Sequence, residues 1–257
     1  MTRTALVPTM GALHDGHLAL VHRVRELADR VVVSIFVNPT QFGAGEGFDR
    51  YPRTLDADRA LLGDLAEVFA PTVDEVYPPS NPPTVVHAGQ MGELWEGAAR
   101  PGHFDGVLTV VNRLFDLVKP DIAVFGEKDW QQLTLIRRMV VERGFPIEIV
   151  GVPTVREPSG LALSSRNRNL SPDELEKAAL LPAVLQQIAE SGGTSESIIR
   201  GAARLDDAGF VVDYLDVVDE NTLEPTIDSA NARVIVAARI GTTRLIDNMP
   251  VAPVPER

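Results

Sequence analysis

Two strand-like runs separated by a helix-like run open this chain, and their spacing restricts the fold more than any other feature. Ala5-Leu6-Val7 is a short apolar run, and residues 31–37 form a mostly β-branched run that ends at Asn38-Pro39, where proline stops a strand. Between them, apolar residues recur at helical spacing from Leu18 to Ala28. A strand, a helix and a strand in this order predict a βαβ unit, with parallel pairing and a right-handed crossover.

The same alternation continues to about residue 153. The pattern predicts helices over 54–65, with Thr54 as a possible N-cap, over 107–118, and through Leu133 to a stop at Gly144. It predicts strands over 68–70, 73–77, 122–125 and 147–152. Strands and helices in alternation are typical of a doubly wound parallel sheet. We therefore expect a Rossmann-like α/β domain over residues 1–154.

The rest of the chain predicts a smaller C-terminal α+β domain over residues 155–257. Ser171-Pro172-Asp173-Glu174 is a capping box with proline at the first helical position, and Pro182 is expected to kink the helix that follows. A further amphipathic run covers about 196–205. The stretch 211–218 alternates like a half-exposed strand, and 233–240 with 243–246 predict an antiparallel pair around Gly241.

Composition limits the partners that this chain can have. The formal net charge of −12 repels polyphosphate at long range and disfavours a DNA or tRNA partner, whereas a local basic cluster can still bind ATP. The chain has no cysteine, which fits a reducing cytoplasm. No apolar run approaches the roughly 20 residues of a membrane span, and a strand starts almost directly after Met1-Thr2-Arg3, which leaves no room for a signal peptide. We expect a cytoplasmic protein with no nucleic-acid and no membrane partner.

The turn between the first strand and the first helix carries His14-Asp15-Gly16-His17. Backbone N–H groups at a helix N-terminus lack helical partners and the helix dipole favours negative charge, so two imidazoles there predict a triphosphate site. The alternatives are a zinc pair or two surface histidines. Zinc is the weaker alternative, because the chain offers no cysteine and no HExxH-type carboxylate.

Three polar turns follow strands and should converge at one edge of the sheet, where ligands of open parallel sheets bind. The first holds Met10 and the two histidines, the second is Asn38 to Gln41, and the third is Gly126 to Asp129. The carboxamides of the second turn can bind a hydroxyl and a carboxylate without adding charge. Lys128 can neutralise phosphate, and Gln132 lies one turn into the next helix. Taken singly, each of these residues also fits a solvated strand end.

The segment Leu163-Ser164-Ser165-Arg166-Asn167-Arg168 follows a Pro158-Ser159-Gly160 stretch and precedes the capped helix. Two hydroxyls and an arginine on such a loop suit a lid over the β- and γ-phosphates. A serine-rich linker between domains is the alternative.

Several of these segments together resemble the pantothenate synthetase (pantoate–β-alanine ligase) family, which belongs to the superfamily of HIGH- and KMSKS-bearing nucleotidyltransferases and class I aminoacyl-tRNA synthetases. The family's signature is similar to Pro8-Thr9-Met10-Gly11-Ala12-Leu13-His14-Asp15-Gly16-His17. Further matches occur in the family's order at Asn38-Pro39-Thr40-Gln41-Phe42, Asp49-Arg50-Tyr51-Pro52-Arg53, Gly102-His103-Phe104-Asp105-Gly106-Val107, Gly126-Glu127-Lys128-Asp129 and Leu163-Ser164-Ser165-Arg166-Asn167.

The resemblance implies a ligase that condenses pantoate with β-alanine through pantoyl adenylate, releasing pyrophosphate and AMP. It implies ATP with Mg²⁺ as co-substrate, no prosthetic group, and a homodimer formed through the first domain. We consider Asp58 for the ion but assign no residue as a metal ligand. The implied ATP contacts are Met10, Gly11, Ala12, Leu13, His14, Asp15, Gly16, His17, Gly126, Glu127, Lys128, Asp129, Val155, Leu163, Ser164, Ser165 and Arg166.

The resemblance also implies roles in catalysis and substrate binding. His17 is implied to be the catalytic proton donor, and His14, Lys128 and Asn38 are further catalytic candidates. The implied substrate contacts are Gln41 and Gln132 for pantoate, with Gln41 also facing the β-alanine site, and Met10, Arg100 and His103 in the pocket.

Three other functions remain as alternatives. A nucleotidyltransferase of the same superfamily would make a nucleotide product and should lack the carboxamide turn at Asn38 to Gln41. A class I tRNA synthetase is disfavoured by the short length and the acidic charge. A regulatory nucleotide-binding module would leave both histidines and the glutamines without a task.

Overall fold

The computed structural model describes residues 2–43, 47–226 and 231–252. It divides into two compact units, one comprising Met1–Glu127 with Gln131–Pro153, and the other comprising Lys128–Trp130 with Thr154–Arg257. The short segment Lys128–Trp130 therefore groups with the second unit, although it lies between two parts of the first in the sequence.

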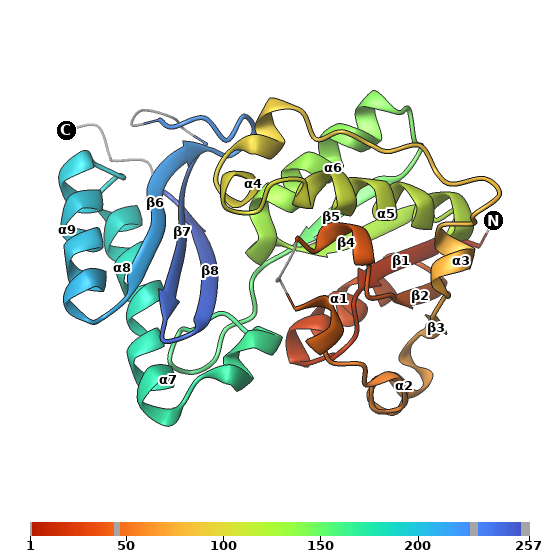
Figure 1. Cartoon of the computed structure of the whole chain (residues 1–257), viewed down its shortest axis with the longest axis horizontal. Coiled ribbons are helices and arrows are strands. Elements are labelled where there is room, and N and C mark those ends of the chain that lie inside the picture. Colours follow the sequence, from red (N-terminus) through yellow and green to blue (C-terminus); the bar gives the residue numbers. More distant parts are fainter. Residues whose placement is uncertain (1, 44–46, 227–230, 253–257) are drawn as a thin grey trace. The chain divides into compact units, whose positions relative to one another are not determined.

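The first unit is built on a five-stranded parallel sheet with the order β3-β2-β1-β4-β5 (Figure 1). This confirms the predicted Rossmann-like sheet. In the register of the central strands, Ala5 pairs with both Val31 and Ile122. The strands are β1 (Thr4–Thr9), β2 (Arg30–Ile35), β3 (Glu67–Phe69), β4 (Ile122–Gly126) and β5 (Glu148–Val152).

Both faces of the central strands are buried, which explains why their sequences are apolar without alternation. One face packs in a core with α1, through alternate residues such as Ala5, Val7, Val31 and Val33. The residues between them are buried as well, since Leu6 is fully inaccessible and Val32 nearly so.

Helices and short 3-10 turns connect these strands. The α-helices are α1 (Asp15–Arg25), α2 (Leu55–Leu62), α3 (Val73–Val76), α4 (Glu96–Ala99), α5 (His103–Val118) and α6 (Trp130–Glu142). The 3-10 turns are η1 (Pro39–Gln41), η2 (Phe48–Arg50), η3 (Gly63–Leu65), η4 (Gln90–Glu93) and η5 (Glu127–Asp129).

One local prediction in this unit is wrong. The sequence pattern predicts a strand over 73–77, but 73–76 form a helix because Thr72 and Glu75 make a capping box at its start. Thr54 is the N-cap residue of α2, as predicted, although its side chain makes no capping hydrogen bond to the backbone. Its hydroxyl donates instead to Asp58 Oδ2 at 3.1 Å.

The second unit is α+β, as expected. Its antiparallel sheet has the order β6-β7-β8 and turns at Gly241, whose φ is 54°. The strands are β6 (Val211–Asp219), β7 (Ala232–Ile240) and β8 (Thr243–Pro250), and the helices are α7 (Pro172–Ala178), α8 (Leu180–Glu190) and α9 (Ser195–Asp207). Helices α8 and α9 pack on one side of this sheet (Figure 1).

The predicted capping box at Ser171 is present, with Pro172 in the first turn of α7. Instead of a kink at Pro182, the helix is interrupted earlier, between Ala178 and Leu180, so that Pro182 lies in the first turn of α8, where proline is tolerated. Among all helices in the described part of the chain, none is long and apolar enough to cross a membrane.

Candidate active site

The strand order of the first unit reverses between β1 and β4, and this switch point is where open α/β sheets bind ligands. The three polar turns singled out in the sequence follow the carboxyl ends of β1, β2 and β4, which are neighbours in the sheet. The first two turns touch, because Gln41 Nε2 lies 3.2 Å from Met10 Sδ.

The two histidines of the first turn cap helix α1. His14 is the N-cap residue, and its Nδ1 accepts a hydrogen bond from the backbone N–H of Gly16 at 3.1 Å. His17 Nδ1 accepts from the backbone N–H of His14 at 3.3 Å, which completes a capping box, and the ring centroids are 4.1 Å apart. An Nδ1 atom that accepts a hydrogen bond carries no proton. Each neutral ring therefore carries its hydrogen on Nε2, as a donor.

Asp58 anchors the backbone that leads into these histidines. It is buried, and its two carboxylate oxygens accept the N–H groups of Ala12 at 3.1 Å and Leu13 at 2.8 Å. The turn needs such support, because Ala12 has a φ of 52°, in the left-handed region that non-glycine residues seldom adopt. Gly11 has a φ of 82°, and a Cβ atom there would lie 3.0 Å from Asp58 Oδ2.

Asn38 fixes the orientation of Gln41 in the second turn. Its Nδ2 group donates to Gln41 Oε1 at 3.0 Å and to the carbonyl of Gly106 at 3.1 Å. Its Oδ1 atom accepts from the hydroxyls of Tyr77 at 2.7 Å and Thr40 at 3.0 Å. Asn38 is only 1% exposed. With Oε1 engaged, Gln41 presents its amide N–H₂ group, which suits a carboxylate or hydroxyl acceptor.

Tyr77 and Gly106 shape the same turn from other elements. Burial raises the pKa of the Tyr77 hydroxyl, so this group stays protonated and able to donate to Asn38 at neutral pH. Gly106 on α5 allows close approach, because a Cβ atom there would lie 2.3 Å from the carbonyl oxygen of Thr40.

Arg100 and His103 hold the main chain of Gln41. His103 Nδ1 lies 2.8 Å from the Gln41 carbonyl oxygen, and Arg100 Nη1 lies 3.0 Å from His103 Nε2. Because arginine only donates, Nε2 of His103 accepts in this pair and its Nδ1 donates to the carbonyl.

The remaining predicted residues divide between the units. Gln132 lies half-buried in the first turn of α6. Lys128 belongs to the second unit and lines one pocket with Ser164 and Arg166. Its side chain is 17% exposed, with Nζ 3.9 Å from Asp129 Oδ1.

The Ser-Ser-Arg segment lies at the start of a 3-10 turn, η6 (Ser165–Asn169), which is capped by Ser164, whose Oγ accepts from the N–H of Arg166 at 3.2 Å. The N–H of Leu163 donates to the carbonyl of Val155 at 2.9 Å, so two of the predicted contact residues are adjacent. The sequence did not point to four further residues, namely Tyr77, Arg156, Asp247 and Asn248. Each makes a hydrogen bond or ion pair with a residue far away in the sequence: Tyr77 with Asn38, Arg156 with Asp247, and Asn248 with Lys128.

Comparisons with known proteins give a consistent result over nearly the whole chain. A family model described as pantoate-beta-alanine ligase matches residues 1–250. Pantothenate synthetase from Acidothermus cellulolyticus is 53% identical, over 96% of this chain and 85% of that protein. The crystal structure of pantothenate synthetase from Thermus thermophilus has a TM-score of 0.92 and 52% identity, and the match covers 98% of this chain and 94% of that one.

A second similar crystal structure contains ligands. It is that of pantoate-beta-alanine ligase from Francisella tularensis, complexed with "Beta-gamma ATP" and β-alanine. It has a TM-score of 0.83 and 36% identity, and the match covers 99% of this chain and 92% of that one.

Proposed function

Since this chain belongs to the pantoate-β-alanine ligase family, we propose that the polar groups described above carry out the two half-reactions of that activity. The chain is an ATP-dependent ligase that forms pantothenate from pantoate and β-alanine. In the first half-reaction, a pantoate carboxylate oxygen attacks the α-phosphorus of ATP, the bond from that phosphorus to the bridging oxygen breaks, and pyrophosphate leaves. In the second, the amine of β-alanine attacks the acyl carbon of pantoyl adenylate, and AMP leaves with the former carboxylate oxygen.

The proposed ATP contacts include the two histidines of the first turn, Lys128 and the Ser-Ser-Arg segment. His14 and His17 donate hydrogen bonds from Nε2 to phosphate oxygens, and the Nε2–H group of His17 is the donor to the negative charge that builds on the leaving pyrophosphate. Lys128 and Arg166 supply fixed positive charge, and Ser164 and Ser165 supply hydroxyl donors. Phosphoryl transfer needs little covalent help from a protein, so positioning and charge stabilisation supply most of the rate.

The proposed pantoate contacts are the amide groups of Gln41 and Gln132, with Met10 as an apolar neighbour. Gln41 also faces β-alanine in this proposal. Because Asn38 is almost inaccessible and bonds both Gln41 and Gly106, we propose that it orients Gln41 instead of touching substrate. Arg100 and His103 have the same task toward the backbone of Gln41.

ATP is proposed to react as its Mg²⁺ complex, with the ion on phosphate oxygens and water. In the described residues, no three His, Asp or Glu side chains are grouped to hold a metal ion. Asp58 fits a structural role better, since both its oxygens accept backbone N–H groups. The ion, when bound, neutralises part of the triphosphate charge. Chelation of Mg²⁺ should abolish turnover, and full activity in chelator would exclude this part of the proposal.

The main support for these proposed roles is the capping of α1 by two imidazoles. The capping bonds leave each ring with an Nε2–H donor, at a helix N-terminus that follows β1, next to the switch point of the sheet. The decisive test is isotope exchange between pyrophosphate and ATP with pantoate as the only organic acid, followed by AMP release when β-alanine is added. Both reactions should occur. Exchange that requires a nucleotide acceptor instead would favour a nucleotidyltransferase.

A homodimer formed through the first unit is also proposed, on the family likeness alone. Sedimentation equilibrium at micromolar protein should give twice the chain mass. A monomer at that concentration would exclude the dimer and leave the catalytic proposal untouched.

A further inference from the structure

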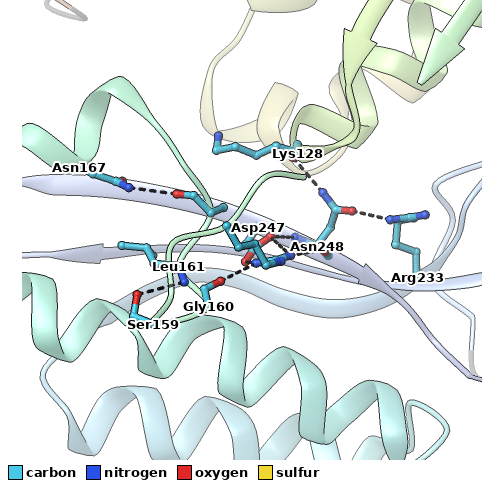
Figure 2. A network of polar contacts seen from close by, with 10 residues as sticks. Lys128, Ser159, Gly160, Leu161, Asn167, Arg233, Asp247 and Asn248 are labelled. Atoms are coloured by element: carbon cyan, nitrogen blue, oxygen red, sulfur yellow. Dashed lines mark hydrogen bonds and ion pairs between the residues drawn. The ribbon is translucent and has the colours of Figure 1, made fainter. Parts of the chain in front are cut away.

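Adjacent residues of β8, Asp247 and Asn248, bond to the Lys128 backbone and to the hairpin that leads into the Ser164–Arg166 segment. Asn248 Nδ2 donates to the main-chain carbonyl of Lys128 at 2.9 Å (Figure 2). The Oδ1 atom of the same amide accepts from Arg233 Nη1 at 2.6 Å. Asn248 is 5% exposed, so water competes little for these bonds. The Lys128 backbone is thus held by a side chain whose own orientation is fixed.

The other end of the short Lys128–Trp130 segment is fixed by the same neighbours. The Arg233 guanidinium lies 3.5 Å from the centroid of the Trp130 ring, a cation–π contact. Trp130 Nε1 donates to the Glu220 carbonyl at 3.0 Å. Arg233 therefore connects both ends of the segment, through Asn248 at one and through the indole at the other.

Asp247 holds the hairpin that leads into the Ser164–Arg166 segment. Its buried carboxylate forms a bidentate ion pair with Arg156, at 2.7 and 3.0 Å. Arg156 also donates to the Gly160 carbonyl at 3.0 Å and forms a β-bridge with Ala162. Asn167 then ties the end of that hairpin to η6, donating to the Ala162 carbonyl at 3.0 Å (Figure 2).

We propose that Asn248 and Asp247 are positioning residues for the adenylation step, which hold Lys128 and the Ser164–Arg166 segment in a fixed relation to each other. This inference rests on the proposed function of those two segments. It assigns a task in the reaction to two β8 residues that are not among the proposed substrate contacts. Partners that orient metal ligands contribute about 10- to 100-fold to activity, and we expect an effect of that size for these positioning residues.

The test uses Asn248→Leu, which keeps the size of the side chain and removes both hydrogen bonds. We expect pyrophosphate exchange to fall by about 10- to 100-fold in kcat. The reaction of supplied pantoyl adenylate with β-alanine should keep its rate, because no triphosphate takes part in it. A merely structural role would slow both half-reactions together, and that result would overturn the inference.

Two further variants serve as a control and as a second test. Gln187→Leu makes the same amide-to-aliphatic change at an exposed site on α8 and should leave both half-reactions unchanged. Asn248→Asp, which keeps the partner of Arg233 but loses the donor to Lys128, should reproduce the selective loss if Asn248→Leu folds poorly. Selective loss in neither variant would overturn the inference.

A double variant separates this inference from the function on which it rests. If Asn248 acts through Lys128, then Lys128→Ala with Asn248→Leu should exchange no more slowly than Lys128→Ala alone. Multiplied losses would show that Asn248 acts by another route and would overturn the inference. If Lys128→Ala itself exchanged normally, the proposed role of Lys128 would fail, and the positioning role with it. If Lys128→Ala lost exchange and Asn248→Leu did not, only the positioning role would fail.

Discussion

The carboxylate of Asp58 accepts the backbone N–H of Leu13 at 2.8 Å, although the two residues are 45 positions apart in the chain. With its bond to the N–H of Ala12, it ties the first turn of the active site to helix α2. This pair of bonds fixes the chain immediately before the two capping histidines, so it connects the stability of the fold to the geometry of the proposed phosphate-binding turn.

Asp58→Asn should destabilise the protein and slow adenylation. An amide cannot accept two N–H groups with both of its terminal atoms, and a hydrogen bond to a charged group contributes about 1.5–3 kcal/mol. We expect a loss of that size in the free energy of unfolding, measured with urea, together with a lower exchange rate. Asp56→Asn, an exposed change in the same helix, is the control and should unfold like the unmodified protein. Equal stabilities for the two variants would contradict the anchoring role.

His17→Ala should lose most of its turnover while remaining folded. Removal of one donor to a developing charge commonly costs about 2.7–4 kcal/mol of barrier, or about 100- to 1,000-fold in kcat. The measurement is steady-state kcat, with circular dichroism to establish that the variant is folded. His22→Ala alters an exposed imidazole on the same helix and should keep full activity. Near-normal turnover of His17→Ala would contradict the role of His17 as a donor to the leaving pyrophosphate.

Tyr77→Phe should weaken pantoate binding, because Asn38 loses the 2.7 Å hydrogen bond that helps to orient it. We expect a several-fold rise in KM for pantoate with KM for ATP unchanged, and a stability loss of about 0.5–1.5 kcal/mol. Because burial raises the pKa of Tyr77 above its ordinary value of 10.0, the stability that this hydroxyl contributes is fully present below that value. It is lost as pH rises through the raised pKa. A KM for pantoate unaffected by the substitution would argue against this positioning of Asn38.

Gly106→Ala should displace the η1 turn, since the added Cβ would meet the Thr40 carbonyl at 2.3 Å. Overpacking of this kind typically costs about 1–3 kcal/mol. We expect a lower melting temperature and a lower kcat/KM for pantoate, measured by calorimetry and initial rates. Leu117→Ala, at an exposed position of the same helix, is the control and should leave kcat/KM for pantoate unchanged. If Gly106→Ala kept its melting temperature and its kcat/KM, the close packing of α5 on the turn would be unimportant.

The sheet and the turns that follow its strands could be predicted because buried parallel strands leave a local signal. Runs such as Val31 to Val33 are apolar throughout, and the residues that stop them, including Pro39, are strong signals of a strand end. The capping box at Ser171 was equally local and is present in the structure. The proposed roles of His17 and Lys128 in the reaction stay predictions.

The contacts that orient the active-site groups could not be predicted, because each joins residues far apart in the chain. Nothing near Asn248 in the sequence indicates that its amide meets the carbonyl of Lys128, 120 positions away. The misassigned 73–77 segment shows a second limit. Its apolar and β-branched residues favour a strand, but a capping box spanning Thr72 to Glu75 starts a helix there. The sequence also shows no sign of the role of Tyr77, because its hydrogen bond to Asn38 joins residues 39 positions apart.

In the double imidazole cap of α1, an unprotonated Nδ1 on each histidine caps the helix and leaves the N–H of the neutral ring on Nε2. A proton added to Nδ1 of His14 or His17 would remove the lone pair that receives the backbone hydrogen, so the start of the helix would lose its closing bond as the ring changed charge. Each side-chain cap of α1 is therefore made only by a ring whose Nδ1 carries no proton, and a neutral ring in that state has its N–H on Nε2. The protonation state of these two imidazoles and the capping of helix α1 are therefore linked.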